Sequence, residues 1–273
     1  MKLHDGRLAI AIAIAITVAW AAALVGCGTG RESRPAATVG AEAEAADAAV
    51  APPPLVEAEW FQLLGGRSAT TLASVAPGFE PARFGGNGPI EESEAGVRLE
   101  AGAPLTGITF PAGQSTVLTP CGAEYEYEIE VVAARLAGTD FFCALTFPVD
   151  AAALTLVLGG WGGSTCGFSC LDGRDAANNP TTTWRRFDKG VFVSARVRVT
   201  RDRIEAFVDG EPLCSTPRAG VVLSLRPEVE PCRPLGIASY ATTAMIRSAR
   251  WRPLPEGSSA PAAAPLTPAT RGG

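Results

Sequence analysis

Hydrophobic and polar residues alternate along the middle of the chain. In the run 124–131, apolar Tyr, Ile and Val positions alternate with glutamates, and in the run 191–199 a row of Val and Ala stands opposite Arg196 and Arg198. Successive side chains of a β-strand point to opposite faces of its sheet. Each run therefore predicts a strand with one buried face, and we expect the glutamates of the first to face the arginines of the second across a sheet.

Shorter apolar runs predict further strands. The range 203–211 is predicted to be a strand that enters a tight hairpin turn at Asp209-Gly210, a dipeptide that favours such turns. The other predicted strands are 97–100, 141–147, 154–158, 235–240 and 244–251. No stretch of this region has a helical period. Many short strands separated by Gly, Pro, Asp and Asn predict an all-β jelly-roll sandwich of two antiparallel sheets.

Composition divides the chain around this sandwich. We expect the folded domain at 58–254, a length that single all-β domains reach. The segment 27–57 is rich in Ala, Glu and Pro, and 255–273 consists largely of Pro, Ala, Gly, Ser and Thr. Such compositions bury too little apolar surface to fold, so we predict a disordered tether before the domain and a disordered tail after it.

The first 26 residues have the layout of a secretory signal peptide. Lys2 and Arg7 precede an almost wholly apolar stretch that runs to Gly26. The tetrapeptide Leu24-Val25-Gly26-Cys27 resembles the lipobox of bacterial lipoproteins, which implies that Cys27 is lipidated and begins the mature chain. An uncleaved membrane anchor is the alternative. An Asp directly after the lipidated cysteine would retain such a lipoprotein at the inner membrane of Gram-negative bacteria, and this chain has Gly28 at that position. We therefore expect an extracytoplasmic, lipid-anchored protein at the outer membrane.

Charge and histidine content exclude several function classes. Lys2, Asp5 and Arg7 leave with the signal peptide, so the remainder carries 21 Lys and Arg against 27 Asp and Glu, a net charge of about −6. This balance is not that of a nucleic-acid-binding protein. The only histidine, His4, lies in the signal peptide, which excludes Ser-His-Asp and Cys-His catalysis from the mature chain.

If Cys27 carries a lipid, six cysteines remain, an even number. In an oxidising compartment we expect disulfides among them, and Cys166 and Cys170 are close enough in sequence to close a small loop. Cys143 fits equally well as a buried free thiol, and a metal cluster is the least favoured interpretation. The set is Cys121, Cys143, Cys166, Cys170, Cys214 and Cys232.

Several strings together resemble a known family. They are 140–149 (DFFCALTFPV), 159–163 (GGWGG), the strand end 208–210, and 226–231 leading into 234–238. With these strings the chain resembles the 3-keto-disaccharide hydrolase-like domain over nearly all of 60–254. The resemblance implies a concanavalin A-like jelly roll and action on oxidised glycosides, but it assigns no catalytic residue.

A polar loop after Trp161 is the first candidate site. It combines Asp172, Arg174, Asp175, Asn178 and Asn179. Planar hydrogen-bonding groups beside an aromatic face are typical of sugar sites. We therefore predict glycan contacts for Trp161, Arg174, Asn178 and Asn179, with Asp172 and Asp175 as catalytic carboxylates. A plain polar turn and a calcium site are the alternatives.

A second charged cluster contains Glu228 and Glu230, flanked by Arg226 and Arg233. Two residues apart on a strand, the carboxylates would lie about 7 Å apart, within the range of glycosidase pairs. We predict Glu228 as a third catalytic candidate and the arginines as substrate contacts. Ion pairing within the cluster is the alternative.

The predicted function is a tethered carbohydrate-active domain that binds, and in its enzymatic form cleaves, glycosides. A structural or protein-interaction sandwich lipoprotein is the alternative. No cofactor is expected apart from the calcium alternative. The predicted partners are a glycan or glycoside and the membrane that holds the lipid anchor.

Overall fold

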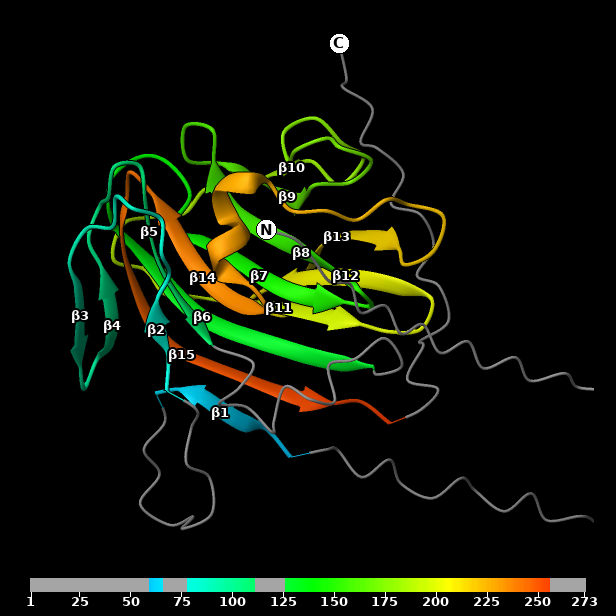
Figure 1. Ribbon diagram of the computed structural model, residues 1–273, viewed down its shortest axis with the longest axis horizontal. Coiled ribbons are helices and arrows are strands. Elements are labelled where there is room, and N and C mark those ends of the chain that lie inside the picture. The colour runs from blue at the N-terminus through cyan, green and yellow to red at the C-terminus, as the bar shows by residue number, and fades with distance from the viewer. Residues whose placement is uncertain (1–58, 66–77, 111–125, 256–273) are drawn as a thin grey trace, which may run out of the picture. The chain divides into compact units, whose positions relative to one another are not determined.

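The computed structural model describes residues 59–65, 78–110 and 126–255, which form a β-sandwich of two antiparallel sheets (Figure 1). Sheet A has the order β13-β12-β11-β6-β15-β4-β3, with β1 also paired to β15, and sheet B has the order β10-β9-β8-β7-β14-β5-β2. This confirms the predicted all-β jelly-roll class. The signal peptide, Cys27, the tether, the tail beyond Pro255 and Cys121 lie outside the described residues.

The strands of sheet A are β1 (Phe61–Leu64), β3 (Ile90–Ser93), β4 (Gly96–Leu99), β6 (Tyr127–Ala137), β11 (Val193–Val199), β12 (Arg203–Val208), β13 (Glu211–Pro217) and β15 (Thr243–Pro253). The strands of sheet B are β2 (Glu80–Pro81), β5 (Leu105–Phe110), β7 (Cys143–Val149), β8 (Ala152–Gly160), β9 (Thr165–Ser169), β10 (Thr183–Trp184) and β14 (Leu235–Tyr240). The short 3₁₀-helix η3 (Pro227–Cys232) precedes β14. None of the described helices is long and apolar enough to cross a membrane.

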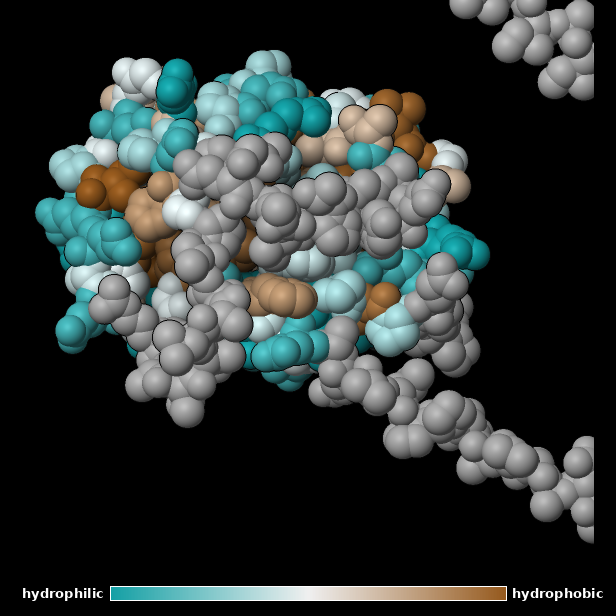
Figure 2. All heavy atoms as spheres, turned by 60° about the horizontal axis from the view of Figure 1, so that its bottom comes forward, coloured by the Kyte–Doolittle hydropathy of each residue, from teal (hydrophilic) through white to brown (hydrophobic). Residues whose placement is uncertain are grey.

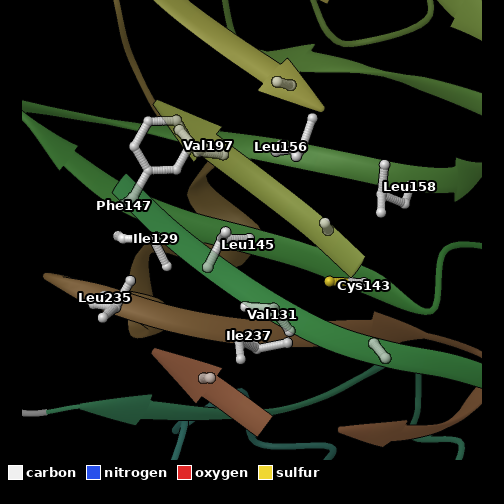
Figure 3. Packing of buried hydrophobic residues seen from close by; sticks show 14 of the residues in the cluster. Ile129, Val131, Cys143, Leu145, Phe147, Leu156, Leu158, Val197, Leu235 and Ile237 are labelled. Atoms are coloured by element: carbon white, nitrogen blue, oxygen red, sulfur yellow. The ribbon is translucent and has the colours of Figure 1, made fainter. Parts of the chain in front are cut away.

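The core lies between the two sheets. Ile129, Val131 and Val197 of sheet A meet Leu145 and Leu156 of sheet B, and all five side chains are buried (Figure 3). Burying apolar area of this kind is the main stabilising contribution to folding, at about 25 cal/mol per Å². The predicted strands with one buried face are therefore confirmed for β6 and β11, whose apolar positions point into the core.

The predicted hairpin is present between β12 and β13. Asp209 and Gly210 form its two-residue turn, with φ of 54° and 83°. Two successive positive φ values match the right-handed twist of the flanking strands, which is why Asp-Gly is favoured there.

The glutamate row lies on the outer face of sheet A and meets the predicted arginines. Glu128 is fully buried, and its carboxylate contacts Arg198 Nε at 2.7 Å and Arg252 Nη2 at 2.7 Å. Arg196 approaches the same carboxylate at 3.7 Å. Burial alone would raise the pKa of Glu128, but the hydrogen bonds from Arg252 and Arg198 outweigh it and lower the pKa. The row therefore stabilises sheet A.

The disulfide prediction is wrong for the cysteines that the structure describes, because all five are free thiols. Cys166 lies in β9 and Cys170 directly follows the end of this strand. Even the three steps of extended strand from Cys166 to Ser169 span roughly 10 Å at 3.3 Å per residue, and a disulfide needs Cα atoms within about 7 Å. Cys143 is a buried free thiol, the second of the two interpretations offered for it. Burial raises the pKa of both the Cys143 and the Cys232 thiols to about 12.

The outer face of sheet B is partly covered by η3, drawn in orange in front of β14 and β7 in Figure 1. Val229 and Cys232 of η3 pack in a second apolar cluster with Ala144 of β7 and Ala238 of β14. Sheet B is therefore apolar on both faces near η3.

Large hydrophobic side chains are sparse on the described surface. In Figure 2 hydrophilic residues dominate the coloured atoms, and hydrophobic ones occur in small groups. The exposed large hydrophobic residues are Phe61, Trp161, Trp184, Val191, Val222 and Tyr240. Two of them, Trp161 and Tyr240, belong to the pocket described next.

Candidate glycan-binding pocket

A pocket of about 290 Å³ opens on the outer face of sheet B beside η3. This volume is at the lower end of the range for small-ligand sites. Its floor is formed by strand residues and its rim by three loops and η3. The lining residues are Leu105, Asp140, Phe141, Ala144, Thr155, Val157, Trp161, Ser169, Arg226, Glu228, Val229 and Tyr240.

The floor is mostly apolar and rigid. Ala144 of β7 and Val157 of β8 are paired across the two strands, and both are buried. Thr155 brings a hydroxyl to the floor, but its Oγ1 lies 3.0 Å from Oγ1 of Thr146. Most of the polar contacts available to a ligand must therefore come from the rim.

Trp161 lies on the rim, in the turn between β8 and β9. Its φ of 47° is in the left-handed region, which non-glycine residues rarely occupy. Its backbone N–H donates to Oδ1 of Asp140 at 3.2 Å, and its side chain is 43% exposed. An indole held in a strained turn and left open to solvent indicates a surface built for contact rather than for packing.

Buried Arg135 of β6 supports this turn from inside the sandwich. Its Nη2 donates to the carbonyl oxygens of Gly159 at 2.9 Å and Gly163 at 3.0 Å, which flank Trp161. A Cβ on Gly159 would lie 2.3 Å from the same nitrogen, so only glycine leaves room for the guanidinium. Burial lowers the pKa of Arg135, and the carboxylate of Asp140 partly offsets this.

Asp140 connects the aromatic residues of the rim. Its Oδ1 accepts hydrogen bonds from the backbone N–H groups of both Trp161 and Phe141, and its own N–H donates to Oγ1 of Thr242. Tyr240 N–H donates to the carbonyl of Phe141, and their ring centroids are 5.5 Å apart. The Asp140 carboxylate thus links the 140–141 segment to the Trp161 turn, while backbone hydrogen bonds of Asp140 and Phe141 link it to Thr242 and Tyr240. No described residue donates to Oδ2 of Asp140.

The opposite side of the rim is charged. Arg226 Nη2 and Nε contact the two carboxylate oxygens of Glu228 at 2.9 and 3.3 Å, and Arg226 Nη1 lies 3.5 Å from Oδ2 of Asp175. The hydrogen bond to Arg226 lowers the pKa of Glu228 and raises that of Arg226. Both groups are therefore charged at neutral pH, and both present polar atoms to the pocket.

The structure brings only part of the predicted site together. Trp161, Arg226 and Glu228 line the pocket, and Asp175 reaches it through its contact with Arg226. Glu228 and Glu230 lie on η3 and not on a strand, so the predicted strand spacing is wrong. Each glutamate forms an ion pair with its neighbouring arginine, as in the alternative interpretation.

The remaining predicted residues do not line the pocket. Oδ1 of Asp172 accepts from Val222 N–H at 2.9 Å, and Arg233 pairs with Glu230 at 2.7 Å. Arg174 is exposed, and exposed Asn178 donates to Oδ1 of Asp175.

Asn179 is buried, and its side chain serves the loop. Its Nδ2 donates to the carbonyls of Phe168 and Asp175, and its Oδ1 accepts from Thr181. The pocket does not require Asn179, which stabilises the loop.

Sequence reasoning missed Asp140, Phe141, Tyr240 and Arg135. Asp140 and Phe141 begin one of the strings that carry the family resemblance, so a signal for them was present. Arg135 had a weaker signal, because it is a single charge in the otherwise apolar run 131–136. No sequence signal identified Tyr240, because it is the last residue of a predicted strand.

The described residues offer no metal site. No group of three or more His, Cys, Asp or Glu side chains in the described ranges is arranged to hold a metal ion. Asp172 and Asp175, the ligands of the calcium alternative, each hydrogen-bond backbone N–H groups.

The fold and the pocket define a two-sheet β-sandwich with an aromatic-rimmed pocket on one outer face. No protein-family model matches the chain, and no curated protein sequence matches it. The resemblance to the 3-keto-disaccharide hydrolase-like domain thus stays a prediction.

Solved structures with a similar arrangement are distant. The carbohydrate-binding module CBM66 from Bacillus subtilis has 13% identity and a TM-score of 0.39, covering 64% of this chain and 95% of its own. The Crh5 transglycosylase in complex with NAG has 11% identity and a TM-score of 0.44, with 71% and 83% covered. The Ca²⁺-bound exoplasmic/lumenal domain of VIP36 has 14% identity and a TM-score of 0.43, with 71% and 89% covered. At this level of similarity none of them assigns a function to this chain.

Proposed function

We propose that this protein is a glycan-binding domain that holds a glycoside in the pocket on the outer face of sheet B. The observation that carries the proposal is the meeting of Trp161, Tyr240 and Phe141 with the polar groups of Asp140, Arg226 and Glu228 around one cavity. Aromatic rings contact the C–H faces of a pyranose, and the charged groups bond its hydroxyls. This lining suits an uncharged ring bearing hydroxyls better than a wholly apolar ligand.

Cleavage of a glycoside is the second candidate, favoured by the two carboxylates, Asp140 and Glu228, that line the same pocket. A general acid for glycoside hydrolysis needs a raised pKa, whereas Arg226 lowers the pKa of Glu228. Glu228 is therefore suited to binding a hydroxyl as a carboxylate, and not to protonating a leaving group. For this reason we place binding ahead of hydrolysis of 3-keto-glycosides.

The location belongs to the same proposal. The lipobox at 24–27 supports a domain anchored by a lipid on Cys27 outside the cytoplasm, at the outer membrane. Radiolabelled palmitate incorporation that is lost in Cys27→Ala, together with membrane fractionation, tests this. An unlabelled protein, or one found in the inner membrane, would contradict it.

The decisive experiment is a ligand panel. The purified full chain is titrated calorimetrically with methyl glycosides, their 3-keto forms and a glycan array, and the mixtures are analysed for products. Binding without products is expected. Product formation would replace the binding proposal with the hydrolase, and absence of both would leave the structural sandwich.

Binding should depend on pH in one direction only. Glu228 has a pKa below its ordinary value of 4.5, so the Arg226–Glu228 pair is intact above that value and is lost as the pH falls through the lowered pKa. We expect a constant affinity at neutral pH and a decrease only as the pH falls below 4.5, measured by calorimetry with the best methyl glycoside. Glu228→Gln should remove the acid limb, and an affinity that changes near neutral pH would contradict this assignment.

A further inference from the structure

Trp184 on β10 is 72% exposed, the largest exposed fraction among the large hydrophobic residues of the described surface. It does not line the pocket. Its strand is the outermost of sheet B and pairs only with β9. An indole left this open on a two-residue strand contributes little to the core.

Strand register places Trp184 on the same face of sheet B as the pocket. Trp184 is the partner of Thr165, and directly paired residues point to the same side of a sheet. Thr165 and Ser169 share a face of β9, while Cys166 and Phe168 point into the core. Ser169 lines the pocket, so the Trp184 side chain projects from the pocket side.

The Trp161 turn lies at the same end of the sheet. Gly160, next to Trp161, is paired with Thr165, so the two tryptophans are about two strand spacings apart, roughly 10 Å. The N–H of Arg185 donates to the carbonyl of Ser164 at 2.9 Å and fixes β10 against this turn. A Cβ on Gly162 would meet nothing within 4 Å, so the turn leaves open space beside Trp161.

We propose that the pocket is one end of a longer binding surface and that Trp184 is its second aromatic platform. The inference rests on the proposed glycan binding and specifies its ligand as a linear oligosaccharide, because the backbone separation of the two tryptophans, roughly 10 Å, exceeds one pyranose ring. One ring of the oligosaccharide occupies the pocket against Trp161, and a later ring stacks on Trp184.

The test uses a length series. The purified full chain is titrated with methyl glucoside and with the cello-, laminari- and malto-oligosaccharides from disaccharide to tetrasaccharide. Affinity is expected to rise about tenfold from monosaccharide to tetrasaccharide in the series that binds, in keeping with one added ring contact. In Trp184→Ala most of this gain should disappear, and in the matched surface control Val222→Ala it should be retained.

The outcomes separate the two proposals. Affinity that does not rise with length, or a Trp184→Ala variant that loses nothing, overturns the second platform while leaving the pocket assignment in place. An equal loss for every length, with a lowered melting temperature, assigns Trp184 a structural role and also overturns it. Binding in none of the series, together with no binding in the glycan array, overturns the pocket assignment and the second platform together.

Discussion

Replacing Trp161 with alanine is expected to weaken glycoside binding by about tenfold or more, equivalent to ~1.4 kcal/mol, with little effect on folding. The indole is 43% exposed and makes its contact with the pocket, not with the core, so its removal leaves no internal cavity. Calorimetric titration of the variant with the best methyl glycoside measures the loss. A melting temperature close to that of the original chain is part of the expected result.

The control for this variant is Val191→Ala, which truncates another exposed hydrophobic side chain that does not line the pocket. Its affinity should equal that of the original chain. If Trp161→Ala binds as tightly as the control, the indole does not contact the ligand, and the assignment of Trp161 to the site is wrong.

Replacing Arg135 with methionine is expected to reduce both stability and affinity. Methionine has a comparable length but cannot donate to the carbonyls of Gly159 and Gly163, which would be left without these partners. Unsatisfied buried polar groups cost about 1–3 kcal/mol each, so for these two carbonyls we expect the free energy of unfolding to fall by about 2–6 kcal/mol. Urea denaturation measures this change.

Measuring the affinity of the folded variant distinguishes a role of Arg135 in positioning the Trp161 turn from a role in stability alone. Titrations at a temperature where Arg135→Met is fully folded should still show weaker binding, because the turn that holds Trp161 at a φ of 47° has lost its inner support. Arg135→Lys, which keeps the charge and a donor, should recover part of the affinity. Exposed Arg174→Met should change stability by less than ~0.5 kcal/mol. Unchanged affinity in folded Arg135→Met would show that the turn holds its shape without the guanidinium.

Strands with one buried face could be predicted from sequence, and some edge strands could not. β6 and β11 alternate cleanly because their outer faces meet solvent or ion pairs. β13 was missed because it begins at Glu211-Pro212 and ends at Pro217. Prolines are tolerated there because β13 is the edge of sheet A and needs hydrogen bonds on only one side.

The pocket was only partly predictable for a related reason. Ala144 and Val157 of its floor alternate with core residues that are equally apolar, so β7 and β8 show no period that would identify an outer face. Trp161, Arg226 and Glu228 were found because charged and aromatic residues stand out from their neighbours. Asp172 and Arg233 stood out equally, yet Asp172 accepts from the backbone N–H of Val222, fifty residues away, and Arg233 pairs with Glu230. Only the fold distinguishes such structural partners from a pocket.

The first and last strands of the sandwich are neighbours, since Phe61 of β1 is paired with Trp251 of β15. Both belong to sheet A, and the pocket opens on the outer face of sheet B. Both ends of this domain therefore start from sheet A, the sheet opposite the pocket. A domain immobilised on a sensor chip through β1 or β15 is therefore held by the sheet that does not carry the pocket.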